Sequence, residues 1–137
     1  MSEKFSIKLT SNLDDFENVQ KFVVEKLSDC SCSQKILMQI EIMIEEIFVN
    51  ISKYGYAPDE GEITVQCGIE KTAVEITFTD FGKKFNPLAK DDADTTLSAE
   101  ERPVGGLGIF MTKKFADNLD YKYEDGKNIL TIRKNFG

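Results

Sequence analysis

Two short connections between apolar segments constrain the fold of this chain most strongly. Residues 61–69 and 72–80 are rich in Val, Ile, Thr and Phe and are separated by a turn near Glu70-Lys71. A second pair, near residues 119–124 and 128–134, turns at Asp125-Gly126, a dipeptide typical of hairpin loops. Because strands joined by a tight turn pair antiparallel, the two pairs predict a mixed, mainly antiparallel sheet.

The remaining segments predict helices and one more strand. Residues 3–10 alternate polar and apolar side chains, as a short strand does. Residues 12–29 have apolar side chains at helical spacing, and Ser33 can cap a second helix that runs to about Tyr54. A helix of about ten residues is expected to end at Ala116. This order predicts an α+β fold: a two-layer sandwich with the helices on one face of the sheet, in a single domain over residues 1–137.

Composition excludes several kinds of site. The chain has 137 residues, a net charge of −7, three cysteines and no histidine. The negative charge argues against nucleic-acid binding through phosphates, and structural zinc lacks its usual four ligands. The sequence has no run of eighteen apolar residues, so no membrane span is predicted. No signal peptide is apparent, and we therefore expect a cytoplasmic protein. Without histidine, a general base at neutral pH must be a carboxylate or a lysine.

The segment "MIEEIFVNISKYGY" places polar residues in an otherwise apolar helix. Glu46 and Asn50 are four residues apart and therefore share one helix face, beside the apolar stripe. One interpretation is a solvated face, with Glu46 paired to Lys53 or another cation. The other is a nucleotide–metal site, where the amide oxygen of Asn50 ligates Mg²⁺ and Glu46 activates a nucleophile.

Two glycine-containing motifs allow a similar pair of interpretations. Asp80-Phe81-Gly82 ends a strand and is either an ordinary turn or a carboxylate that accepts a hydrogen bond from a ligand. Gly105-Gly106-Leu107-Gly108 precedes a helix and is either a hinge or a phosphate cradle built from backbone N–H groups. Between them, residues 82–103 form a long polar stretch that is expected to be a functional loop.

Taken together, these motifs resemble the GHKL ATPase superfamily and, within it, the bacterial anti-sigma factor serine/threonine kinases. The segments that carry the resemblance are "EEIFVNISKYGY", "TDFGKKFNP", "RPVGGLGIFMTKKFADNLDY" and "DGKNILTIRK". They occur in the family's order and span nearly the whole chain. The resemblance implies the GHKL ATPase fold, with ATP and Mg²⁺ as cofactors.

The resemblance also implies a role for individual residues. It implies that Glu46 is the catalytic base and that Asn50 ligates the Mg²⁺ bridging the ATP phosphates. It implies that Asp80 accepts a hydrogen bond from the adenine amino group and that Gly82 lies beside the adenine ring. It implies that residues 83–104 form the ATP lid. Further ATP contacts are implied for Arg102, Gly105, Gly106, Leu107, Gly108 and Thr131.

Three residues depart from the family's pattern. Lys84 replaces the second glycine of the superfamily's D-x-G-x-G, although Phe85 satisfies the D-x-G-x-x-F common in the kinase branch. Tyr54 stands where histidine is frequent, and Asn86 where aspartate is common before proline. None of these departures removes the proposed base or metal ligand.

The resemblance implies an ATP-dependent protein kinase that is also an anti-sigma factor. Its implied substrate is a serine or threonine on a STAS-domain anti-anti-sigma protein, and its implied second partner is an RNA polymerase sigma factor. A homodimer is implied too. The alternatives are a catalytically silent ATP-binding module, the detached ATPase domain of a sensor histidine kinase, and an α+β domain whose glycines are only hinges.

Overall fold

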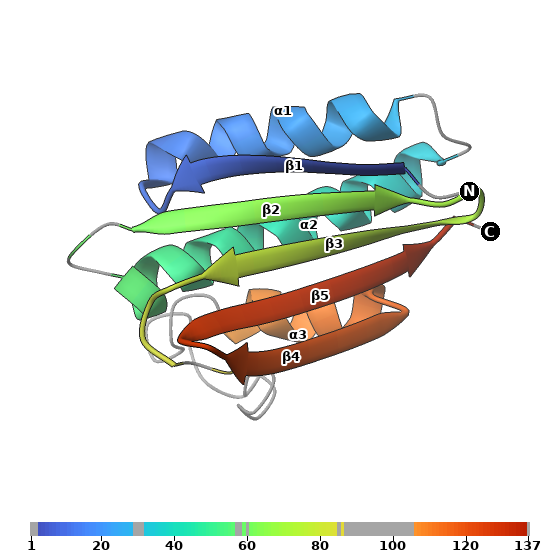
Figure 1. Cartoon of the computed structure of the whole chain (residues 1–137). Helices are drawn as coiled ribbons and strands as arrows, with labels where there is room; N and C mark the ends of the chain where they lie inside the picture. Colours follow the sequence, from blue (N-terminus) through green and yellow to red (C-terminus); the bar gives the residue numbers. More distant parts are fainter. Residues whose placement is uncertain are drawn as a thin grey trace.

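A computed structural model describes residues 3–28, 32–56, 59, 61–84, 86 and 106–136, with the backbone alone at 54–55 and 106–110. The strands are β1 (Glu3–Thr10), β2 (Glu62–Ile69), β3 (Ala73–Asp80), β4 (Asn118–Glu124) and β5 (Lys127–Asn135). The α-helices are α1 (Phe16–Leu27), α2 (Gln34–Asn50) and α3 (Gly106–Phe115). All three helices cover the same face of the sheet, which confirms the predicted α+β sandwich (Figure 1).

The sheet has the order β1-β2-β3-β5-β4, and every pairing within the described residues is antiparallel. The prediction of a mainly antiparallel sheet is confirmed, and the prediction that some strand pairs are parallel is wrong for the described residues. The reason is the position of β5, which lies between β3 and β4. Strand β4 runs in the direction of β3, as expected after a helical crossover, but its hairpin partner separates the two.

Capping fixes where the helices begin, as the sequence predicted for Ser33. Its hydroxyl accepts a hydrogen bond from the backbone N–H of Ile36 at 3.2 Å. The end of this helix was predicted less well. The α-helix stops at Asn50, and residues Ile51–Tyr56 continue as a π-helix. π-Helical turns frequently occur at functional sites. No helix in the described ranges is long and apolar enough to cross a membrane.

The core lies between the helix layer and the sheet. Fully buried side chains of α2 pack against alternate residues of the central strands, following the period of two that faces one side of a sheet. They include Ile40, Met43, Ile44, Ile47 and Phe48 on the helix, and Val65, Ile76, Phe78 and Ile132 on the strands. The same period places Asp80 and Asn128 on the helix-facing side, one row beyond the apolar residues.

One close contact fixes the entrance to β2. The space beside Gly61 is filled by the ring of Tyr56, the last residue of the π-helix, so a Cβ at Gly61 would overlap that ring. Backbone and side chain of Ser11 bond to Gly61 as well, through Ser11 N–H to the Gly61 carbonyl and Gly61 N–H to the Ser11 hydroxyl. This corner therefore leaves no room for a side chain.

We predict that Gly61→Ala destabilises the protein by about 1–3 kcal/mol, because overpacking forces Tyr56 out of its place. Gly68→Ala is the matched control, since a Cβ there would meet its nearest atom at 3.7 Å, an ordinary contact. Urea unfolding of both variants measures the difference. Equal stability of the two would contradict the packing described for Gly61.

Candidate functional site

Four segments that are distant in sequence meet at one end of the molecule. Figure 1 places the end of α2, the end of β3, the start of β5 and the start of α3 on the same side. The sheet register agrees, because Asp80 at the end of β3 pairs with Asn128 at the start of β5. The predicted site motifs on α2, β3 and α3 therefore share one region.

Asn50 lies at the point where α2 becomes the π-helix. Its side chain is only 4% exposed, and within the described residues no hydrogen bond to it is recorded. Its amide atoms are not among the buried polar atoms recorded without a partner in the described residues, so its oxygen carries no recorded burial cost and is a candidate ligand. An amide oxygen is one of the hard donors that Mg²⁺ accepts, and Mg²⁺ typically takes its other ligands from phosphates and water.

Glu46 lies one turn before Asn50 and is half-buried. Burial raises the pKa of its carboxyl above the ordinary value, the negative charge of Glu45 raises it further, and Lys53 opposes the shift. In the part of the chain that the structure describes, no ion pair joins Glu46 to Lys53. Lys53 nevertheless acts on Glu46 through its charge, so the solvated-face interpretation stays open, and a carboxylate with a raised pKa also suits a general base.

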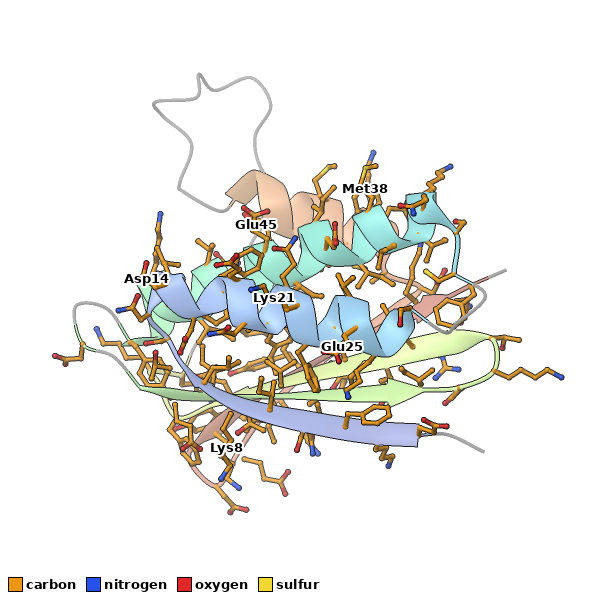
Figure 2. All side chains as sticks on the ribbon, turned by 90° about the horizontal axis from the view of Figure 1, so that it is seen from above. Lys8, Asp14, Lys21, Glu25, Met38 and Glu45 are labelled. Carbon is orange, nitrogen blue, oxygen red and sulfur yellow. The ribbon has the colours of Figure 1, made fainter. Side chains whose placement is uncertain are left out.

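The neighbouring Glu45 has a different environment. Figure 2 shows it on the helix layer, on the side away from the sheet, and its side chain is exposed. The two adjacent glutamates thus face different surroundings because successive helical residues are about 100° apart.

Asp80 is 4% exposed at the end of β3. Its Oδ1 accepts hydrogen bonds from the backbone N–H of Gly82 at 2.9 Å and from Nδ2 of Asn128 at 3.0 Å. Burial raises the pKa of this carboxyl, and the two hydrogen bonds partly offset that rise. Asp80 and Gly82 are therefore brought together as predicted, in a turn that holds the carboxylate towards the helix layer.

The structure separates Thr131 from Asp80. Thr131 faces the opposite side of the sheet, where its hydroxyl lies 3.2 Å from that of Thr77. The position beside Asp80 that was expected for Thr131 is occupied by Asn128. The sequence reasoning did not identify Asn128. The signal was available: along β5 the side chains of Asn128, Leu130 and Ile132 alternate with Thr131, so the period of two assigns them to the helix-facing side.

Tyr56 is a second residue that the sequence reasoning missed. Its hydroxyl donates to the carbonyl of Glu62 at 2.7 Å and accepts from the N–H of Phe81 at 2.7 Å. These bonds tie the end of the π-helix to the residue that follows Asp80. Tyr56 therefore fixes the distance between the segment carrying Asn50 and the turn carrying Asp80.

The glycine motif lies at the start of α3, but it forms the first turn of the helix where we expected it to precede the helix. The helix starts at Gly106, so Gly106, Leu107 and Gly108 form its first turn. The first N–H groups of a helix lack partners within it and attract anions. Arg102 and Gly105 lie outside the described residues, as does most of the predicted lid over residues 83–104.

The residues present fit a Mg²⁺-nucleotide. No cluster of three Asp, Glu, His or Cys side chains that could hold a metal occurs in the described ranges. A Mg²⁺ held by Asn50 would take its other ligands from phosphate and water oxygens, which is the usual arrangement for this ion at nucleotide sites. Asn50 could hold Mg²⁺, Asp80 the base, and the start of α3 the phosphates.

Sequence comparison shows the family of this chain. Residues 9–134 match the family described as the histidine kinase-like ATPase domain, and the chain belongs to that family. It is similar to the serine-protein kinase RsbW of Bacillus mycoides (strain KBAB4), with 30% identity over 98 residues. The match covers 69% of this chain and 61% of that relative, so the chain spans less than two thirds of its length.

Two solved structures share the fold. One contains the RsbU and RsbW domains of Rv1364c from Mycobacterium tuberculosis, with a TM-score of 0.67 and 17% identity over 96% of this chain and 32% of that one. The other is the Acinetobacter baumannii histidine kinase AdeS, with a TM-score of 0.52 and 14% identity over 100% of this chain and 68% of that one. At these identities the similarity shows the fold alone.

We predict that Glu46→Gln raises the free energy of unfolding at pH 8. Folding raises the pKa of the Glu46 carboxyl, so the ionised carboxylate destabilises the folded state. The wild type is therefore destabilised above the raised pKa, and this destabilisation disappears below the ordinary value of 4.5. The advantage of the variant should therefore shrink as the pH falls towards 4. Urea unfolding between pH 4 and pH 8 measures it.

Glu45→Gln is the matched control for this titration, because it removes the same charge from the exposed neighbour. Its own effect on unfolding should stay within about 0.5 kcal/mol across the range, as for most surface substitutions. A pH-dependent gain of equal size in both variants would contradict the difference in environment between the two glutamates.

Proposed function

We propose that this protein is an ATP-dependent serine/threonine protein kinase that also acts as an anti-sigma regulatory factor. The observation that carries the proposal is the pair Glu46 and Asn50, a carboxylate with a raised pKa one turn from an amide side chain, at the same end of the molecule as Asp80. Membership of the histidine kinase-like ATPase family supports ATP as the phosphoryl donor. The name serine-protein kinase given to the relative supports a hydroxyl acceptor.

Each residue then has a role in positioning or in proton transfer. ATP supplies the phosphoryl group when bound, with Mg²⁺ neutralising charge on the phosphates. Asp80 holds the adenine ring, Asn50 ligates the metal, and the N–H groups at the start of α3 bind phosphate. Glu46 would accept the proton of the partner's hydroxyl as that oxygen bonds to the γ-phosphorus of ATP and the bond to the leaving ADP breaks, which is the step that a general base accelerates.

The expected partners follow from the family resemblance. The substrate is a serine or threonine of a STAS-domain anti-anti-sigma protein, and the second partner is an RNA polymerase sigma factor. We expect the protein to act as a homodimer. Partner binding and phosphorylation are separate properties, so an assay must measure both.

We predict that Glu46→Gln lowers the rate of phosphoryl transfer by about 10²–10⁴-fold, the usual contribution of a positioned general base. Glutamine keeps the shape of the side chain, so ATP affinity should change little. The measurement is transfer of label from γ-labelled ATP to a candidate STAS-domain protein under single-turnover conditions, with Glu45→Gln as the control.

Three results are informative. Loss of transfer with Glu46→Gln and retention with Glu45→Gln is the expected one. Equal rates in wild type and Glu46→Gln would remove Glu46 from the chemistry. ATP and partner binding by the wild type without any transfer would favour a catalytically silent ATP-binding module.

A further inference from the structure

The side-chain amide of Asn128 has its orientation set by its neighbours. Its Oδ1 accepts a hydrogen bond from the hydroxyl of Tyr121 at 2.5 Å, and its Nδ2 donates to the carbonyl of Lys83 at 2.9 Å and to Asp80. The carbonyl and the carboxylate can only accept, so the amino group must face them. A flipped amide would set its oxygen against the carboxylate of Asp80.

This fixed amide makes the two oxygens of Asp80 unequal. Oδ1 accepts from both Asn128 and Gly82. Oδ2 accepts no hydrogen bond that the structure records from the described residues. One oxygen is therefore held by the protein, and the other is left to a ligand.

Tyr121 reaches Asn128 diagonally across the β4–β5 pair. In the register Tyr121 pairs with Leu130, and Tyr123 is the residue directly opposite Asn128. Tyr123 is nevertheless 41% exposed, and its ring lies 5.3 Å from Nζ of Lys84. The hydroxyl that orients the amide thus comes from the half-buried tyrosine, and its exposed neighbour provides a matched comparison.

We infer that Tyr121 and Asn128 are positioning residues that make Asp80 selective for an adenine base. Tyr121 orients Asn128, Asn128 occupies Oδ1 of Asp80 together with Gly82, and Oδ2 is left as an acceptor for a base amino group. This inference rests on the proposed ATP site. A base with a carbonyl oxygen in place of the amino group would set one acceptor against another, at a buried site where that mismatch is costly.

Inosine triphosphate is the direct probe, because at position 6 of its base an oxygen replaces the amino group of ATP. Dissociation constants for ATP and inosine triphosphate, each with Mg²⁺, are measured by calorimetry for the wild type, Tyr121→Phe, Asn128→Ala and Tyr123→Phe. Thermal unfolding of each variant is recorded beside them.

The wild type should prefer ATP. Tyr121→Phe should reduce this preference by about 2–10-fold, the value of one hydrogen bond, mainly through weaker ATP binding. Asn128→Ala should reduce it further, by about 10–100-fold, because Oδ1 of a buried carboxylate loses one of its two hydrogen-bond donors and keeps only Gly82. Tyr123→Phe should keep the wild-type preference.

A purely structural role would weaken both nucleotides equally, and an unchanged preference in Tyr121→Phe would overturn the inference while leaving the ATP site in place. Failure of the wild type to bind either nucleotide would overturn the proposed function and this inference together. Should Asn128→Ala not fold, Tyr121→Phe decides the matter, because it removes a single oxygen atom.

Discussion

Burial of the Asp80 carboxylate at the end of β3 is the constraint on which the site depends. A carboxylate at that depth is costly unless it is hydrogen-bonded, and the surrounding segments supply the bonds. Asn128 reaches it from β5, the turn supplies Gly82, and Tyr56 fixes the following residue from the end of the π-helix. Three segments are thus held together around one charged group, with a single carboxylate oxygen left for a ligand.

The end of α2 shows the same compromise between stability and function. The helix contributes several fully buried apolar side chains to the core, yet it also carries Asn50, to which no hydrogen bond is recorded from the described residues, and Glu46 with a raised pKa. Neither residue improves the packing. Such costs are typical of sites that are completed by a ligand, and they are retained where function requires them.

Much of this arrangement could be predicted from local sequence. Hairpin turns and the cap at Ser33 depend on short-range chemistry, and helical spacing already placed Glu46 and Asn50 on one face. The π-helix and the role of Tyr56 could not be predicted, because they depend on contacts with residues far along the chain. The helix-facing position of Asn128 was predictable from strand alternation. The expectation of a threonine near the adenine led instead to Thr131, which lies on the opposite face of the sheet from Asp80.

The central claim is that α2, β3 and α3 form a Mg²⁺-dependent ATP site in which Asn50 binds the metal. Calorimetric titration of the wild type and Asn50→Ala with ATP, in Mg²⁺ and in EDTA, tests it most directly. Mg²⁺ should strengthen ATP binding to the wild type. Asn50→Ala should lose this increase in ATP affinity while keeping the affinity measured in EDTA. ATP binding that Mg²⁺ strengthens equally in both proteins would contradict it.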